Sequence, residues 1–305
     1  MDNLQSRGHL LTEQINPHSK NLDSLSTLEI VDLFNQEDIK TIEAIANARL
    51  TLAQTIDAVA AALKHNGRLF YVGAGTSGRL GVLDAAECPP TFCTDPELVQ
   101  GILAGGTAAL VKSSEALEDL AEDGQQAIAD NQITNLDVVI GITAGGTTPF
   151  VHGALQEAKA RGATTVAISC VSAEQVPIDA DIDIRLLVGA EILAGSTRLK
   201  AGTVTKMALN IISTGAMVRY GKVYGIRMID VAVTNDKLHD RALRILEDLT
   251  ELNRQEANIL LEKSDKKVKL ALLMHWTGLD ATAGKTLLEQ HQGKLRAVVQ
   301  AQHIA

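Results

Sequence analysis

The chain has 305 residues, of which 46% are hydrophobic, 21% charged and 3% aromatic. This composition excludes a disordered chain and indicates a globular protein with an aliphatic core, large enough for one main domain and an appendage. The net charge of -9, without a basic run, excludes an extended nucleic-acid surface, although backbone amides at a helix N-terminus can still bind one phosphate group.

Neither the N-terminus of the chain nor its cysteines indicate export. No charged segment followed by an apolar stretch opens the sequence, and no uncharged apolar run reaches about 18 residues, so we expect no membrane segment. Cys88, Cys93 and Cys170 form no CxxC pair and leave one over in any disulfide scheme. We therefore expect reduced thiols, a cytoplasmic location and no metal site.

Five short apolar, β-branched runs predict buried strands, and helical patterns separate most of them. The strand runs are 69–72, 98–103, 138–143, 165–169 and 184–188. Helices are predicted over 41–65, 108–129 and 149–161. This alternation predicts an α/β fold with a doubly wound, five-stranded parallel sheet.

The two ends of the chain differ from this middle part. The first 40 residues are polar and predict an arm that wraps the core or a neighbouring subunit. After residue 200 the pattern is helical, and from 239 it is charged and amphipathic without strand signals. We therefore divide the chain into an arm (1–40), a main domain (41–238) and a small C-terminal helical module (239–305). Helices in the module are predicted over 241–252, 256–262, 268–276 and 284–299.

The first predicted strand leads into a glycine-rich loop, residues 73–78, with the sequence GAGTSG. Its glycines fit the G-x-G-x-x-G pattern of dinucleotide sites, but the second strand lacks the carboxylate at its end that would bind a ribose. The hydroxyls of Thr76 and Ser77 instead favour a nest for one phosphate monoester. A strand-to-helix turn without a ligand is the alternative.

Two more loops follow predicted strands. Residues 143–149 (TAGGTTP) combine a glycine pair with hydroxyls, and residues 189–203 alternate hydroxyls, cations and a carboxylate with small residues. Because ligands bind beyond the carboxyl ends of parallel strands, we expect the three loops to converge on a polyhydroxylated ligand. Ordinary helix caps would produce the same residue types.

Glutamates supply the candidate acids and bases. Pro89 and Pro90 are expected to end the helix that begins near Ser77, which would put Glu87 at a helix C-terminus and favour the protonated carboxyl of a general acid. An exposed helix-end carboxylate without a role is the alternative. A second acidic group follows an i, i+3, i+7 pattern on the predicted 108–129 helix, and this pattern does not choose among its members. They are Glu115, Glu118 and Glu122.

The glycine loop running into residues 84–90 (DAAECPP) resembles the N-acetylmuramic acid 6-phosphate etherases, which have the sugar isomerase (SIS) fold and are related to the glucokinase regulatory protein. The resemblance covers nearly the whole chain, including residues 25–29, 195–203 and 234–238. It implies that water cleaves the lactyl ether of N-acetylmuramate 6-phosphate to N-acetylglucosamine 6-phosphate and D-lactate in cell-wall recycling. No cofactor, metal, nucleic acid or membrane is implied, and a homodimer is expected.

The resemblance also implies the site residues. Glu87 would be the catalytic acid and Glu118 the second catalytic carboxylate, although Glu115 stands one turn earlier. Relatives often carry serine where this chain has Gly145, so Thr147 or Thr148 would have to contact the phosphate. The implied substrate-binding residues are Gly75, Thr76, Ser77, Gly78, Arg79, Gly146, Thr147, Thr148, Glu191, Ser196, Thr197 and Lys200.

Two other functions suit a phosphosugar-binding fold. A regulator without catalysis would need the phosphate loops but neither glutamate. An aldose–ketose isomerase would use a base at C2 but leave the C3 substituent in place. The presence of both Glu87 and Glu118 favours the etherase.

Overall fold

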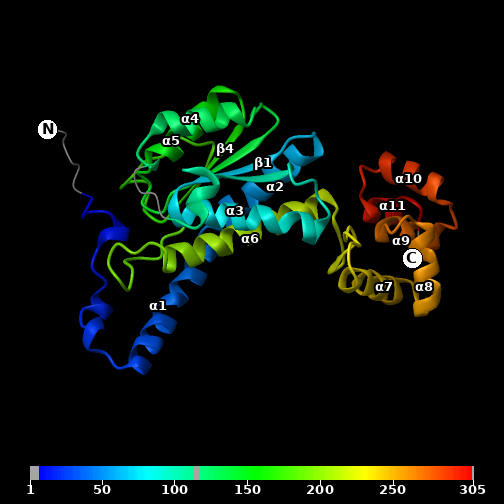
Figure 1. Cartoon of the computed structure of the whole chain (residues 1–305), viewed down its shortest axis with the longest axis horizontal. Coiled ribbons are helices and arrows are strands. Elements are labelled where there is room, and N and C mark those ends of the chain that lie inside the picture. Colours follow the sequence, from blue (N-terminus) through cyan, green and yellow to red (C-terminus); the bar gives the residue numbers. More distant parts are fainter. Residues whose placement is uncertain (1–6, 113–116, 304–305) are drawn as a thin grey trace. The chain divides into compact units, whose positions relative to one another are not determined.

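The computed structural model describes residues 7–112 and 117–303. Its contacts define two compact units (Figure 1). The sheet unit comprises Met1–Ala86 and Glu97–Ser213, and the helical unit comprises Glu87–Pro96 and Thr214–Ala305. The polar N-terminal segment is thus part of the sheet unit, and the helical unit takes in residues well before 239.

The N-terminal segment forms short 3-10 turns and then two helices, where the sequence predicted one helix over 41–65. The turns are Leu11–Glu13, Pro17–Ser19 and Leu22–Ser24. Helix α1 spans Thr27–Asn47, and α2 spans Arg49–Lys64. The side chain of Ser26 accepts from the Glu29 amide and the Glu29 carboxylate accepts from the Ser26 amide, a capping box that starts α1. Only a narrow, half-polar stripe of α1 is buried, which explains why periodicity did not reveal its first half.

The predicted parallel sheet is confirmed, with strand order β2-β1-β3-β4-β5. Every pair in this sheet is parallel. The strands are β1 (Leu69–Gly73), β2 (Val99–Leu103), β3 (Val138–Ile142), β4 (Thr164–Ser169) and β5 (Ile182–Arg185). Strand β1 is buried along its whole length, as a strand covered on both faces must be.

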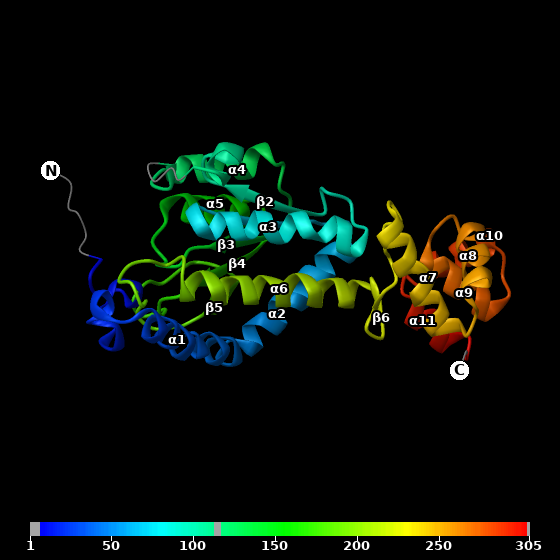
Figure 2. The same cartoon turned by 60° about the horizontal axis from the view of Figure 1, so that its bottom comes forward.

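Helices cover both faces of the sheet. Figures 1 and 2 show α4 (Ala121–Asp130) and α5 (Pro149–Ala160) together over one face. Phe70 and Val72 point to this face and share a core cluster with residues of both helices. Tyr71 points the other way, toward α3 (Gly75–Phe92). A Cβ on Gly81 of α3 would lie 2.7 Å from the Tyr71 side chain, so this packing requires glycine.

The helix predicted over 108–129 is wrong in its first half. Within the described part of that half, Gly106–Leu110 form a short 3-10 helix, and α4 begins only at Ala121. Glu118 precedes α4, and its carbonyl accepts a hydrogen bond from the Phe150 amide at 3.1 Å. This pairing to the start of α5 keeps Glu118 out of the helix. Glu115 lies outside the described residues.

The expected helix end at the two prolines is also wrong. Helix α3 continues through Pro89 and Pro90 to Phe92. Burial of Cys88 and Phe92 stabilises the last turn despite the two missing amide donors, since tertiary packing can outweigh local propensity. The residue after the helix, Cys93, has a left-handed φ of 49°, a common way for a helix to end.

The helical unit contains the helices predicted after residue 239, except that the last one is split in two. These helices are α7 (Asp236–Thr250), α8 (Arg254–Lys263), α9 (Val268–Thr277), α10 (Ala281–Gln290) and α11 (Leu295–Ala301). They enclose their own apolar core together with an unpredicted hairpin, β6 (Val223–Tyr224) and β7 (Arg227–Met228). The long helix α6 (Lys200–Tyr220) runs from the sheet unit into this part of the chain. Within the described ranges, no helix is long and apolar enough to cross a membrane.

Candidate functional site

The glycine loop forms the turn from β1 into α3. Gly75 has a φ of 53°, which only glycine adopts readily. Gly73 and Gly78 lie so close that a Cβ on Gly78 would be 2.4 Å from the Gly73 carbonyl oxygen. This approach directs the first turn of α3, with Thr76 and Ser77, toward the carboxyl edge of the sheet, where helix amides can bind an anion.

The third-strand loop brings Glu118 and two threonines to the same edge. The hydroxyls of Thr143 and Thr148 are 2.9 Å apart, and Pro149 occupies the first turn of α5 as predicted. The backbone bond from Phe150 to Glu118 places Glu118 beside this loop. Its side chain is half-buried.

The loop after β5 is held by Glu191. Its carboxylate is buried and accepts from the amides of Lys200 at 3.0 Å and Ala201 at 2.9 Å, which caps the N-terminus of α6. Burial raises the pKa of Glu191, and these two amide hydrogen bonds oppose the increase. Glu191 therefore fixes the end of this loop by binding the backbone amides of Lys200 and Ala201.

Lys200 is fully buried, and its ammonium group contacts Glu37 of α1. Lys200 Nζ lies 2.6 Å from Glu37 Oε2 and 2.7 Å from the Ala190 carbonyl oxygen. Burial alone would raise the pKa of Glu37, but hydrogen bonds from Lys200, Lys40, His18 and Asn16 hold that pKa well below its usual range. The ion pair fastens the start of α6 to α1.

The N-terminal segment lies across two of the loops. The His9 carbonyl oxygen accepts from the Gln175 side chain at 2.9 Å. A Cβ on Gly145 would lie 3.7 Å from the Thr12 hydroxyl, and one on Gly195 would lie 3.0 Å from a Glu13 carboxylate oxygen. Thr12 and Glu13 therefore approach the third-strand loop and the loop after β5, respectively.

These segments enclose a cavity of about 380 Å³ within the sheet unit, a size that suits a small ligand. It brings together eight of the predicted site residues. Those eight are Gly75, Thr76, Ser77, Arg79, Glu118, Thr147, Thr148 and Thr197. The remaining lining residues are Arg7, Leu10, Thr12, Glu13, Ala74, Ala144, Gly145 and Gly195.

Several predicted residues do not line the cavity. Gly78 packs on Gly73, and a Cβ on Gly146 would meet Val176 at 3.1 Å, so these glycines shape their loops. The others outside its lining are Glu191, Ser196, Lys200 and Glu87. Glu87 is exposed on α3, more than one turn before the end of that helix at Phe92.

The N-terminal contribution to the cavity was missed by sequence reasoning. Arg7, Leu10, Thr12 and Glu13 belong to a polar, aperiodic stretch, and nothing local in such a stretch indicates which loop it will meet. Only the expectation that residues 1–40 form an arm around the core anticipated that this segment contacts other parts of the chain. Among the described residues, no group of three or more His, Cys, Asp or Glu side chains could hold a metal ion.

Comparison with known proteins gives a consistent family. The glucokinase regulatory protein N-terminal SIS domain matches residues 51–159, and the SIS domain matches residues 116–213. The N-acetylmuramic acid 6-phosphate etherase of Crocosphaera subtropica is 72% identical over 99% of this chain and 99% of its own length. That of a Picosynechococcus species is 73% identical over 98% of this chain and 99% of its own. Among solved structures, a phosphoheptose isomerase from Francisella tularensis aligns with 64% of this chain and 98% of its own at 15% identity, with a TM-score of 0.47.

Proposed function

The chain belongs to the family of N-acetylmuramic acid 6-phosphate etherases, and on that premise we infer that it cleaves the D-lactyl ether of N-acetylmuramate 6-phosphate with water. The products are N-acetylglucosamine 6-phosphate and D-lactate, and the reaction belongs to cell-wall amino sugar recycling. Identity above 70% over nearly the full length carries this assignment. We place the enzyme in the cytoplasm, in keeping with its three free thiols.

We propose that the cavity of the sheet unit binds the phosphosugar. The hydroxyls of Thr76 and Ser77 and the first turn of α3 would hold the phosphate, with Thr147 or Thr148 contributing from the neighbouring loop. Arg79 donates from Nε to the carbonyl oxygen of Ala109 at 2.9 Å, which fixes its position at the same cavity. Glu118 shares that cavity, which supports its approach to the bound sugar.

The proposed chemistry uses two carboxyl groups. The aldehyde of the opened sugar acidifies the C2 proton, which Glu118 removes as a base. Glu87 donates a proton to the lactate oxygen as the bond from C3 to that oxygen breaks, and water then adds to C3 of the unsaturated aldehyde. One carboxyl must accept and the other donate, so two different environments suit the reaction.

We propose that Glu87 serves the cavity of a second copy. Glu87 lies eleven positions after Thr76 on α3, about 16 Å along the helix axis, which is longer than one hexose phosphate. Helix α1 also exposes a stripe of large apolar side chains that are 58–69% accessible. The stripe consists of Leu28, Val31, Ile39 and Ile42. Exposed apolar stripes of this kind are typical of subunit contacts, which supports a homodimer.

The reaction is tested with N-acetylmuramate 6-phosphate in heavy-oxygen water that contains deuterium. We expect D-lactate release, solvent oxygen at C3 of the sugar and deuterium at C2. An isomerase would leave the lactyl group in place. Solvent oxygen found only in the lactate would contradict elimination and rehydration.

The roles of the carboxylates are tested with Glu118→Gln and Glu87→Gln. Each is expected to lower kcat for lactate release by at least about a hundredfold, the usual size of a lost acid or base, while phosphosugar binding persists. Glu122→Gln, the same change at an exposed position in the first turn of α4, is the control and should keep full activity. Full turnover by either Glu118→Gln or Glu87→Gln would exclude its proposed role.

A further inference from the structure

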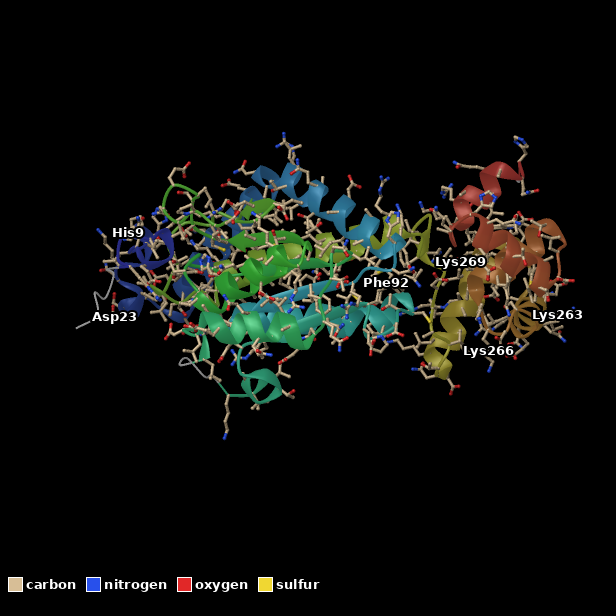
Figure 3. All side chains as sticks on the ribbon, turned by 90° about the horizontal axis from the view of Figure 1, so that it is seen from above. His9, Asp23, Phe92, Lys263, Lys266 and Lys269 are labelled. Carbon is tan, nitrogen blue, oxygen red and sulfur yellow. The ribbon has the colours of Figure 1, made fainter. Side chains whose placement is uncertain are left out.

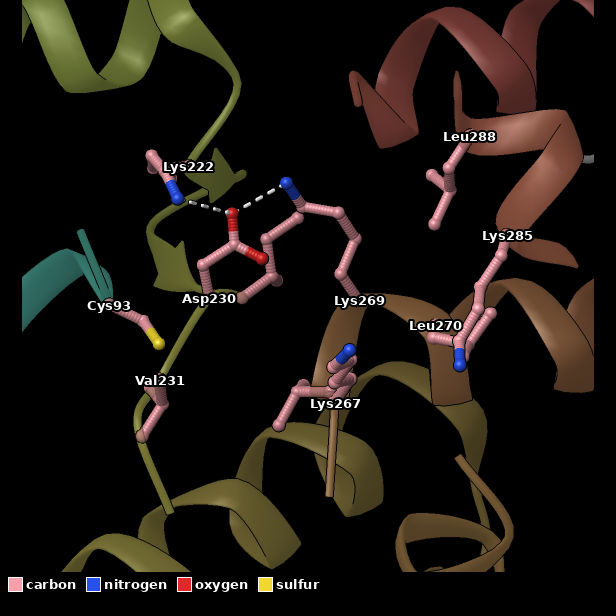
Figure 4. Close-up of a pocket in the computed structure, with 11 residues that line it drawn as sticks. Cys93, Lys222, Asp230, Val231, Lys267, Lys269, Leu270, Lys285 and Leu288 are labelled. Atoms are coloured by element: carbon pink, nitrogen blue, oxygen red, sulfur yellow. Dashed lines mark hydrogen bonds and ion pairs between the residues drawn. The ribbon is translucent and has the colours of Figure 1, made fainter. Parts of the chain in front are cut away.

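A second cavity, of about 200 Å³, lies within the helical unit and shares no lining residue with the first. Four lysines line it together with a single carboxylate, Asp230 (Figure 4). The lysines are Lys222, Lys267, Lys269 and Lys285. The lining therefore carries an excess of three positive charges in a chain whose net charge is -9.

Asp230 neutralises only part of this charge. Its Oδ2 atom lies 2.6 Å from Lys269 Nζ and 3.4 Å from Lys222 Nζ, so one carboxylate serves two ammonium groups. The side chains of Lys269 and Lys222 are only 13% and 17% exposed. Burial lowers the pKa of Lys269, and Asp230 opposes that decrease. A positive charge is thus held where water solvates it poorly, and a nearby anion would stabilise it.

The other two lysines extend this positive region. Lys267 Nζ lies 4.0 Å from Asp265, and both side chains are exposed, so the contact is weak. Lys285 is exposed and has no hydrogen-bond or ion-pair partner among the described residues. A structural role accounts for Lys269, which also donates to the Gly293 carbonyl oxygen at 3.0 Å, but it does not account for Lys267 and Lys285.

The rest of the lining is mainly aliphatic. Val231, Val268 and Leu270 are buried side chains that face the cavity from the segment after the hairpin and from α9. Such walls favour an alkyl chain, whereas inorganic phosphate would lose more hydration than they can replace. The ligand must also be small, because drug-sized ligands occupy cavities of about 300 Å³ or more.

We propose that this cavity binds a small monocarboxylate with a short aliphatic chain. The carboxylate lies between the ammonium groups of Lys267 and Lys285, and the alkyl chain packs on Val268 and Leu270. This site is separate from the etherase cavity, and its occupancy does not depend on the roles assigned to Glu118 and Glu87.

The test uses the full-length protein and calorimetric titration with hexanoate, with hexanol, hexylammonium and inorganic phosphate as comparison ligands. Hexanoate should bind saturably and at least about tenfold more tightly than the other three, because only it combines an anion with an alkyl chain. Tighter binding of phosphate would overturn the assignment in favour of a general anion site. Absence of saturable hexanoate binding at millimolar concentrations would exclude the site.

The variant Lys267→Gln/Lys285→Gln removes two positive charges at the mouth and should weaken hexanoate binding about tenfold. Lys263→Gln/Lys266→Gln is the matched control, since these exposed lysines, labelled in Figure 3, do not line the cavity and the substitution makes the same change in net charge. The control should bind hexanoate within about twofold of the unaltered protein. Thermal unfolding of both variants checks their folding, and equal weakening in both would overturn the proposal.

Discussion

The buried ion pair between Lys200 and Glu37 shows how a residue can serve a site without touching it. Glu37 lies on α1, and Lys200 starts α6, at the end of the loop that contributes Gly195 and Thr197 to the cavity. Their side chains are 3% and 0% exposed, so neither charge has water to replace a lost partner. The pair therefore stabilises one wall of the cavity and the fold together.

Glu37→Gln is expected to leave the Lys200 ammonium buried without its counter-charge and to cost about 3–5 kcal/mol of unfolding free energy. The melting temperature should fall by roughly 10 °C, as measured by calorimetry at pH 7. Glu43→Gln, an exposed change on the same helix, is the control and should shift the melting temperature by no more than about 2 °C.

The difference between the unaltered protein and Glu37→Gln should also depend on pH. The pKa of Glu37 is lowered in the folded chain, so its stabilisation is complete above the unfolded value near 4.3 and is lost as the pH falls below it. The gap in melting temperature should be constant from about pH 8 to 5 and shrink toward pH 3. A gap that is unchanged across this range would contradict the assignment of the pair.

At the scale of elements, the strands were predictable and several helix boundaries were not. Strands β1 and β3 are buried along their whole length because both faces of the sheet are covered, so their apolar composition reveals them. Strand β5 (Ile182–Arg185) is half polar and begins two residues before the predicted run of 184–188. Helix α5 was also found, because Pro149 marks its start and its inner face is apolar. These elements place the loops, and the loops carry most of the predicted cavity residues.

The errors in helix boundaries have a common physical cause. Pro89 and Pro90 weaken the last turns of α3 locally, yet burial of Phe92 keeps those turns helical. Glu118 has a good helix propensity, yet its carbonyl pairs with Phe150 across the fold. In each case a contact between residues distant in the sequence decides the local structure. Local periodicity and propensity in a single sequence do not reveal such a contact.

The turn from β1 into α3 permits a sharp test. Gly78→Ala would put a methyl group 2.4 Å from the Gly73 carbonyl oxygen and 2.5 Å from the Leu103 side chain. We expect a loss of about 1–3 kcal/mol from overpacking and a raised KM, because the first turn of α3 must shift. Thermal unfolding and steady-state kinetics measure the two effects.

Gly145→Ala is the control for this substitution. Its Cβ would meet only ordinary contacts at 3.7 Å and 3.9 Å, from the hydroxyls of Thr12 and Thr147. Its melting temperature should therefore stay within about 2 °C of the unaltered protein. If Gly78→Ala were as stable as Gly145→Ala, the close approach of Gly73 and Gly78 would not be required.

At the scale of the whole molecule, the cavity is assembled from segments that are distant in the sequence. Thr12 and Glu13, Thr76, Glu118 and Thr197 come from four separate stretches, and only the parallel sheet brings the last three to one edge. Glu87 is absent from this lining, although we propose it as the catalytic acid. A second copy that presents Glu87 would complete the pair of carboxyl groups.

Mixed dimers test this arrangement, because the two catalytic variants damage different halves of a shared site. Glu87→Gln and Glu118→Gln are each expected to lose at least about a hundredfold in activity when they pair only with themselves. In a mixed dimer, one site combines Glu118 from the first variant with Glu87 from the second and is intact, while the other site lacks both. After random exchange of subunits, about a quarter of the sites should therefore be active.

Lactate release is measured before and after the two variants are mixed under conditions that exchange subunits, with exchange verified by differently tagged chains. Recovery of roughly a quarter of the unaltered activity supports a site completed by the partner. No recovery despite exchange would mean that both carboxyl groups act within one chain, and α3 would then have to bend to bring Glu87 to the phosphate loop. Ile39→Glu, which puts a charge on the exposed stripe of α1, should also lower the dimer fraction in sedimentation experiments if that stripe forms the contact.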